Sequence, residues 1–169
     1  MDTRWPLLFL LVLSWACSSD NSDDLFIDCR YSAPESIFTN ALSGVEQHEF
    51  FLDKMIGEES LIFSDGSRLR LRQSGCDYLK QEFEYVSPEF DRQKSIAFWF
   101  EESIALLQRI SELGPEYISY RQWAKAMEEK ARSFEMDKNV KLGDGYYAKV
   151  SRQNARGAAI LLLTLSEKP

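Results

Sequence analysis

The clearest alternation of apolar and polar side chains lies between residues 61 and 86. The apolar run at 61–63 leads into a turn sequence containing Asp65-Gly66, and residues 68–73 then alternate arginine and leucine. A second alternating run follows at 78–86. Strict alternation is typical of strands with one buried face, and a glycine-containing turn between two such runs indicates a hairpin. This part of the chain therefore predicts antiparallel strands.

Apolar residues recur at helical spacing in the middle of the chain. Ser87-Pro88 has the residue types of a helix N-cap and first turn, so we expect a helix over about 88–113. Gly114-Pro115 ends it, and a second amphipathic pattern predicts a helix over roughly 116–134. Because the link is very short, the two helices should form a hairpin packed on a sheet.

The remaining segments complete the predicted sheet. Residues 146–151 form a candidate strand and 152–157 a polar turn, whereas 158–165 is apolar without alternation, as expected for a central strand. The segment 45–52 is strand-like, although Glu46 and His48 share a face with apolar residues.

We therefore expect an α+β fold in a single domain over residues 25–169. Its antiparallel sheet of about five strands would come from about 45–86 and 140–165, with the helical hairpin 88–134 packed on one face.

The first sixteen residues differ from the rest of the chain. A short polar start is followed by the mostly apolar run Leu7–Ala16. Ten residues are about half of what a bilayer-spanning helix needs, but they suit the hydrophobic region of a signal peptide. Small residues stand at Ser14 and Ala16, as signal peptidase requires. The prediction is a signal peptide over residues 1–16.

The sequence Leu13-Ser-Trp-Ala-Cys17 resembles the lipobox of bacterial lipoproteins, although Trp15 stands where that class has a small or hydroxyl residue. The resemblance implies that the Cys17 sulfur carries a diacylglyceryl group and that Cys17 is the mature N-terminus. Residues 17–24 would then form the attachment site and a polar tether, and Ser18 resembles the outer-membrane sorting signal. Secretion without lipid is the alternative.

Cysteine and histidine counts limit the chemistry. The chain has three cysteines, and if Cys17 carries lipid then Cys29 and Cys76 remain to form a disulfide. Two free buried thiols are the alternative. With one histidine and no Cys-x-x-Cys pair there is no zinc framework, and no nucleotide-binding motif is present. We expect no metal and no cofactor.

The net charge of the chain limits the kinds of partner that it can bind. The formal net charge is −7, which disfavours binding to nucleic acid. The expected contacts are a membrane, through the lipid anchor, and an unidentified protein.

Three arginines alternate along the strand at 68–73. A turn near residues 75 and 76 would place Arg68 and Arg70 opposite Glu84 and Glu82, but Arg72 opposite a lysine. The pattern predicts a solvated charge ladder in which Arg72 is the least neutralised.

Two functions fit these observations. The first is an exported cell-envelope protein, lipid-anchored on the periplasmic side of the outer membrane or secreted, whose non-catalytic domain binds another protein. Its candidate partner surface includes Arg72, Arg152 and Arg156.

The alternative is a small exported hydrolase. It would use the helix carboxylates Glu101 or Glu128, assisted by His48 or Asp144. His48 stands among glutamates in the sequence, which favours a surface position instead.

Overall fold

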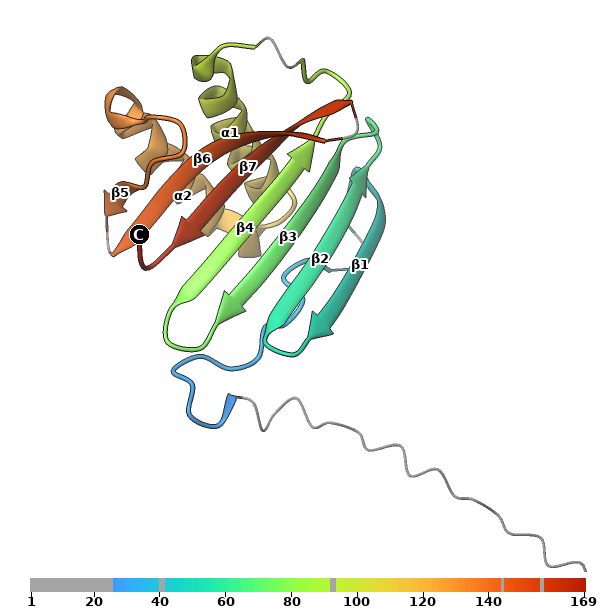
Figure 1. Cartoon of the computed structure of the whole chain (residues 1–169). Helices are drawn as coiled ribbons and strands as arrows, with labels where there is room; N and C mark the ends of the chain where they lie inside the picture. The colour runs from blue at the N-terminus through green and yellow to red at the C-terminus, as the bar shows by residue number, and fades with distance from the viewer. Residues whose placement is uncertain (1–25, 40–41, 92–93, 144, 156) are drawn as a thin grey trace, which may run out of the picture.

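Seven antiparallel strands form one sheet in the order β1-β2-β3-β4-β7-β6-β5, and two helices pack against one of its faces (Figure 1). The computed structural model describes residues 26–39, 42–91, 94–143, 145–155 and 157–169. The strands are β1 (Val45–Asp53), β2 (Ile56–Phe63), β3 (Arg68–Gly75), β4 (Leu79–Val86), β5 (Val140–Gly143), β6 (Tyr146–Ala155) and β7 (Ala158–Ser166). The α+β class is confirmed, but the prediction of about five strands is wrong.

The sequence predicts too few strands for two physical reasons. β5 is only four residues long, too short for an alternation to be visible. β2 begins at Ile56 and carries two consecutive glutamates, Glu58 and Glu59, which hide its apolar face. In β1 the register shifts between Val45 and Gln47, so that Glu46 is the extra residue of a β-bulge. The bulge removes Glu46 from the face that His48 shares with apolar residues.

The β3–β4 hairpin has a different register from the predicted one. Arg70 pairs with Glu84 and Arg72 with Glu82, while Arg68 lies opposite Val86. The strands continue until Gly75 pairs with Leu79, so the turn is centred nearer Asp77 than expected. Each arginine is therefore displaced by two positions relative to β4, and Arg72 faces a carboxylate, not a lysine.

The first helix, α1 (Ile96–Ser111), starts later than the sequence suggests. Its N-cap is Ser95, whose Oγ accepts a hydrogen bond from Phe98 N at 3.2 Å. Ser87 instead closes a local turn, in which Glu89 N donates to its Oγ at 3.3 Å. The segment after this turn folds inward, because the Phe90 ring packs on Trp99 at 5.1 Å between centroids.

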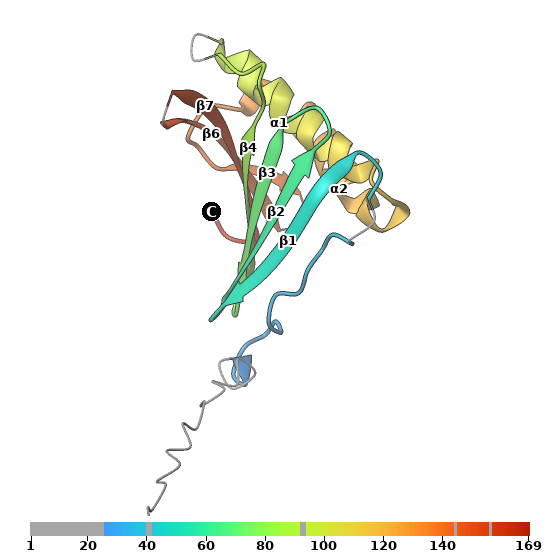
Figure 2. The same cartoon turned by 90° about the vertical axis from the view of Figure 1, so that its right-hand side faces the viewer.

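A short 3₁₀ turn, η2 (Pro115–Tyr117), leads directly into α2 (Ile118–Glu129), and a second one, η3 (Ala131–Ser133), follows it. The helical hairpin is confirmed. It covers the inner face of the sheet, leaving the outer face open (Figure 2). The largest side chains buried between the layers are Trp99, Tyr117, Phe63, Phe83, Leu61, Leu69, Leu71, Leu106, Leu107, Ile110, Met127 and Leu161.

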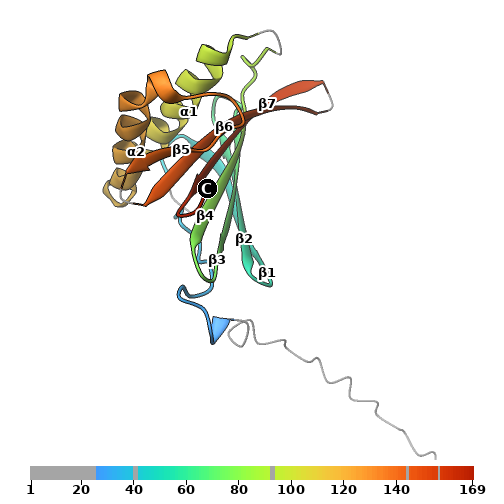
Figure 3. The same cartoon turned by 60° about the vertical axis from the view of Figure 1, so that its left-hand side comes forward.

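β7 lies between β4 and β6, as its continuous apolar sequence predicts. The β6–β7 hairpin extends beyond the end of β4, since β7 pairs with β4 only from Leu161 onwards but with β6 from Ala158 (Figure 3). Residues 152–155 therefore belong to β6 and not to a polar turn. Arg156 lies outside the described residues.

Residues 26–39, here called the N-terminal strap, run along the inner side of the sheet beyond the helices (Figure 2). Cys29 forms a disulfide with Cys76 at the β3–β4 turn. Next to it, Tyr31 N donates to Cys76 O at 3.1 Å, and the Tyr31 hydroxyl donates to Glu167 Oε1 at 2.6 Å. The disulfide is consistent with an oxidising, exported environment. In the described part of the chain, no helix is long and apolar enough to cross a membrane.

Candidate functional site

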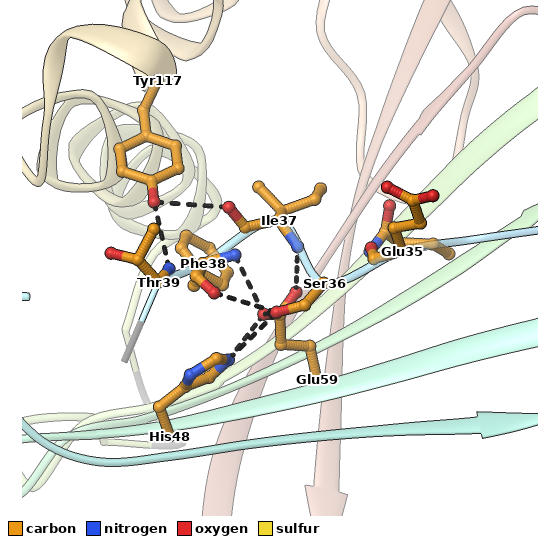
Figure 4. Close-up of polar contacts among 9 residues, drawn as sticks. Glu35, Ser36, Ile37, Phe38, Thr39, His48, Glu59 and Tyr117 are labelled. Carbon is orange, nitrogen blue, oxygen red and sulfur yellow. Dashed lines mark hydrogen bonds and ion pairs between the residues drawn. The ribbon is translucent and has the colours of Figure 1, made fainter. Parts of the chain in front are cut away.

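The most deeply buried carboxylate of the described residues belongs to Glu59, on the inward face of β2 and only 1% exposed. Strap residues surround it (Figure 4). Ser36 Oγ donates to Oε1 at 2.6 Å, Phe38 N donates to Oε1 at 2.9 Å, and Ile37 N donates to Oε2 at 2.9 Å. His48 Nε2 is 2.6 Å from Oε1. A buried carboxylate costs little when it is this fully hydrogen-bonded.

The expectation that His48 lies on the surface is wrong. Its side chain is only 8% exposed, because position 48 shares the inward face of β1 with Phe50 and Leu52 and lies beside Glu59. The Phe38 ring meets the imidazole edge to face at 6.4 Å. Sequence reasoning missed Glu59 altogether. The available signal was that Glu59 is in phase with Leu61 and Phe63 along β2.

Serine, histidine and glutamate side chains meet here, but not in the order of a catalytic triad. In a triad, histidine lies between the nucleophile and the acid, using one ring nitrogen for each. Here Ser36 Oγ and His48 Nε2 both contact the same oxygen, Oε1 of Glu59, and are 3.5 Å from each other. The arrangement binds the strap to β1 and β2.

The helix junction holds the same part of the strap from the other side. The Tyr117 hydroxyl donates to Ile37 O at 3.3 Å and accepts from Thr39 N at 3.4 Å. Burial raises the pKa of this tyrosine, so it remains a neutral donor. The strap is therefore attached to both layers of the fold.

A small cavity of about 190 Å³ lies between the strap, α2 and the end of the sheet. Its walls include the rings of Tyr31, Trp123 and Tyr146, with the amides of Gln73 and Gln81 on the sheet side. Gln73 Nε2 donates to Glu35 O at 3.1 Å, so this wall also holds the strap. The cavity is smaller than the roughly 300 Å³ of typical ligand pockets.

A larger groove of about 480 Å³ lies between the start of α1 and the end of α2. Both carboxylates proposed for a hydrolase, Glu101 and Glu128, line it. Its other lining residues are mostly apolar. We call this the helix groove, and it comprises Ile96, Ala97, Phe100, Glu101, Ile104, Glu128, Ala131, Phe134, Glu135, Met136 and Val150.

The structure does not bring the other proposed hydrolase residues to the helix groove. His48 lies on β1, at the far edge of the sheet, and is bound to Glu59. Asp144 is outside the described residues. Glu128 Oε1 accepts a hydrogen bond from Gln108 Nε2 at 3.0 Å. Of the described residues proposed for a hydrolase, only Glu101 and Glu128 line the helix groove.

The arginines proposed for a partner surface do not form one patch. Arg72 lies on the outer face, where its Nε is 3.7 Å from Glu58 Oε2. Arg152 is on the opposite face of the sheet, with its guanidinium 5.9 Å from the centroid of the Trp99 ring. The third, Arg156, is outside the described residues.

A polar cluster fastens the β2–β3 turn to α1. Arg109 Nη1 donates to Asp65 Oδ2 at 2.9 Å and to the hydroxyls of Ser67 and Tyr85 at 3.0 Å each. The hydrogen bonds from Ser67, followed by that from Arg109, lower the pKa of Asp65 to about 2. Nearby, desolvation and the carboxylates of neighbouring glutamates raise the pKa of Glu102. This cluster stabilises a turn.

No three histidine, cysteine, aspartate or glutamate side chains of the described ranges are placed to hold a metal ion. Comparison with protein-family models, with curated proteins and with solved structures finds no match to this chain. Function must therefore be argued from the chain's own residues.

Proposed function

We propose that this protein is exported to the cell envelope, is anchored by lipid on Cys17, and binds another protein through a domain that performs no chemistry. The anchor would hold it on the periplasmic side of the outer membrane. Release in a secreted form is the alternative location.

The disulfide between Cys29 and Cys76 carries the proposal. Structural disulfides form and persist in oxidising compartments. The pairing of these two cysteines leaves Cys17 as the remaining one of three, and Cys17 is the residue that the lipobox resemblance would modify. Export and lipidation thus account together for all three cysteines.

Binding is favoured over catalysis by the character of the two polar sites. The Glu59 carboxylate is buried, and its oxygens are taken up by hydrogen bonds from the strap. The helix groove is open, and its lining is mostly apolar. Apolar surface of this kind is typical of sites where another molecule binds.

A hydrolase is the second candidate, and one observation favours it: Glu101 and Glu128 line the same groove although they come from different helices. Glu101→Gln and Glu128→Gln in one chain would abolish such an activity. Equal hydrolysis by the parent and by this double variant would refute the hydrolase.

The test is the peptide-level mass of the protein isolated from its native membrane fraction, with and without reduction. We expect a diacylglyceryl-modified Cys17 at the N-terminus and a peptide joining Cys29 to Cys76. Cys17→Ser should release the chain from the membrane without changing the disulfide. A chain that still begins at Met1 and has free thiols would refute export.

A further inference from the structure

The floor of the helix groove is a continuous apolar surface. Ile96, Phe100 and Ile104 follow one another at four-residue intervals along α1, so they form a single ridge. Phe134 packs on Phe100 with a centroid distance of 4.5 Å and closes the floor on the other side. Ile96, at the mouth, is 64% exposed. A large aliphatic side chain in that position leaves most of its surface exposed to solvent.

The rim of the same groove is acidic. Glu101, Glu128 and Glu135 all line it, and no lysine or arginine of the described residues does. Glu135 is paired with Lys138, and Glu128 accepts from the neutral Gln108. Two carboxylates thus remain without a cationic side chain beside them in the groove lining.

We propose that the helix groove binds a basic amphipathic helix of a protein partner. The inference rests on the proposed function and names the chemistry of the partner. The apolar side of such a helix would cover the ridge on α1, including Ile96. Lysines or arginines on its flanks would meet Glu101 and Glu128. Amphipathic helices commonly bind in apolar grooves in this way, and charge complementarity selects the partner.

The ridge on α1 also favours a helix over an extended segment. Ile96, Phe100 and Ile104 are spaced four residues apart, and such a ridge packs into the groove between side chains of another helix. A strand would instead need an open sheet edge for its backbone hydrogen bonds, and the groove lining contains helix, turn and one inward residue of β6, Val150.

The probe for the test is a fluorescent synthetic amphipathic helix of leucine and lysine, titrated with the mature chain that has its disulfide intact. Ile96→Asp and Glu128→Lys should each weaken binding by about tenfold or more. The matched controls are Ile118→Asp, an exposed isoleucine outside the groove, and Glu129→Lys, the next residue after Glu128. Neither control should change the affinity. A peptide with glutamate in place of lysine should not bind.

Equal loss in the groove variants and in their controls would overturn the inference, as would equal binding of the glutamate peptide. Circular dichroism and thermal unfolding would check that each variant is folded. The proposed function is tested separately by the mass of Cys17 and by cross-linking in the envelope. If the protein is lipidated and cross-links to a neighbour but does not bind the lysine peptide, the inference about the groove is refuted and the proposed function is retained. An unlipidated chain with no neighbour would refute the proposed function, whatever the peptide does.

Discussion

The carboxylates of Glu58 and Glu59, adjacent in β2, lie on opposite faces of the sheet in opposite environments. Glu59 Oε1 is 2.6 Å from His48 Nε2 and sealed beneath the strap. The Glu58 carboxylate is about half exposed and lies 3.5 Å from Arg70 Nε. The two residues offer a matched comparison of a buried and a surface carboxylate.

Removing the buried carboxylate should be costly. Glu59→Ala leaves the buried N–H groups of Ile37 and Phe38 without their acceptor, and we expect the free energy of unfolding to fall by about 3–5 kcal/mol. Glu58→Ala should cost less than about 1 kcal/mol. Urea unfolding monitored by tryptophan fluorescence measures both. If Glu59→Ala lowers the free energy of unfolding as little as Glu58→Ala does, the hydrogen bonds to the strap contribute little to stability.

The disulfide and Glu59 both hold the strap, so their contributions to the free energy of unfolding should overlap in part. Replacing Cys29 and Cys76 by serine opens a loop with a sequence separation of 47 and should cost about 3–4 kcal/mol in the chain-entropy model. Both fastenings hold one segment, so the combined variant with Glu59→Ala should lose less than the sum of the two effects. Trypsin cleavage after Arg30 should accelerate in the serine variant. Strict additivity in unfolding experiments would contradict this coupling.

Gly57 is required because the strap passes directly over β2. A Cβ atom at this position would lie 2.8 Å from Pro34 Cβ and 3.1 Å from Phe50 Cε2. Gly57→Ala should therefore lower the free energy of unfolding by about 1–3 kcal/mol. Pro34→Gly in the same chain should recover part of the loss, since it removes the atom that the methyl group meets. No recovery would place the strain elsewhere.

The hydrogen bonds that Asp65 accepts from Ser67 and Arg109 should make the free energy of unfolding depend on pH. The pKa of this carboxyl in the folded protein is about 2, lowered from 3.8. Because the folded pKa is depressed, the contribution is present above pH 3.8 and is lost as the pH falls towards 2. The side chain is about half exposed, so solvent screening limits the contribution to about 1 kcal/mol. Thermal unfolding of Asp65→Asn should show less acid sensitivity in this window than the parent, and equal acid sensitivity would contradict this role of Asp65.

The arginine ladder of the outer face should matter little to stability. Arg70 lies 3.5 Å from Glu58 and 3.4 Å from Glu84, and its side chain is half exposed. Arg70→Ala should lower the free energy of unfolding by less than about 1 kcal/mol, and the difference should shrink in high salt. An effect that persists in high salt would show that packing of the arginine stem, not charge, is responsible.

The sequence predicts the parts of this fold that depend on local pattern. Alternation identifies β3 and β4, and continuous apolar sequence identifies β7 as central. Their exact register was wrong by two residues, because a hairpin register depends on the turn conformation. The position of the first helix failed for a similar reason: Ser87 and Ser95 are both suitable caps, and the packing of Phe90 on Trp99 determines which one is used.

The sites depend on contacts between distant segments. Glu59 is recognisable only once residues 36–38 are placed over it, and those residues have no regular structure of their own. Glu101 and Glu128 are evident as helix carboxylates, but their meeting in one groove follows from how the two helices pack. No local sequence pattern predicts either of these two arrangements.

The covalent link at Cys29 also determines how mechanical load would enter the domain. Tension applied to the chain before residue 29 passes through sulfur to Cys76 and from there into the β3–β4 hairpin. The hydrogen bonds around Glu59 lie downstream of this link and remain unloaded. A pull on the N-terminal side would therefore act on one end of the sheet, and the fastened strap would keep its place on the inner face.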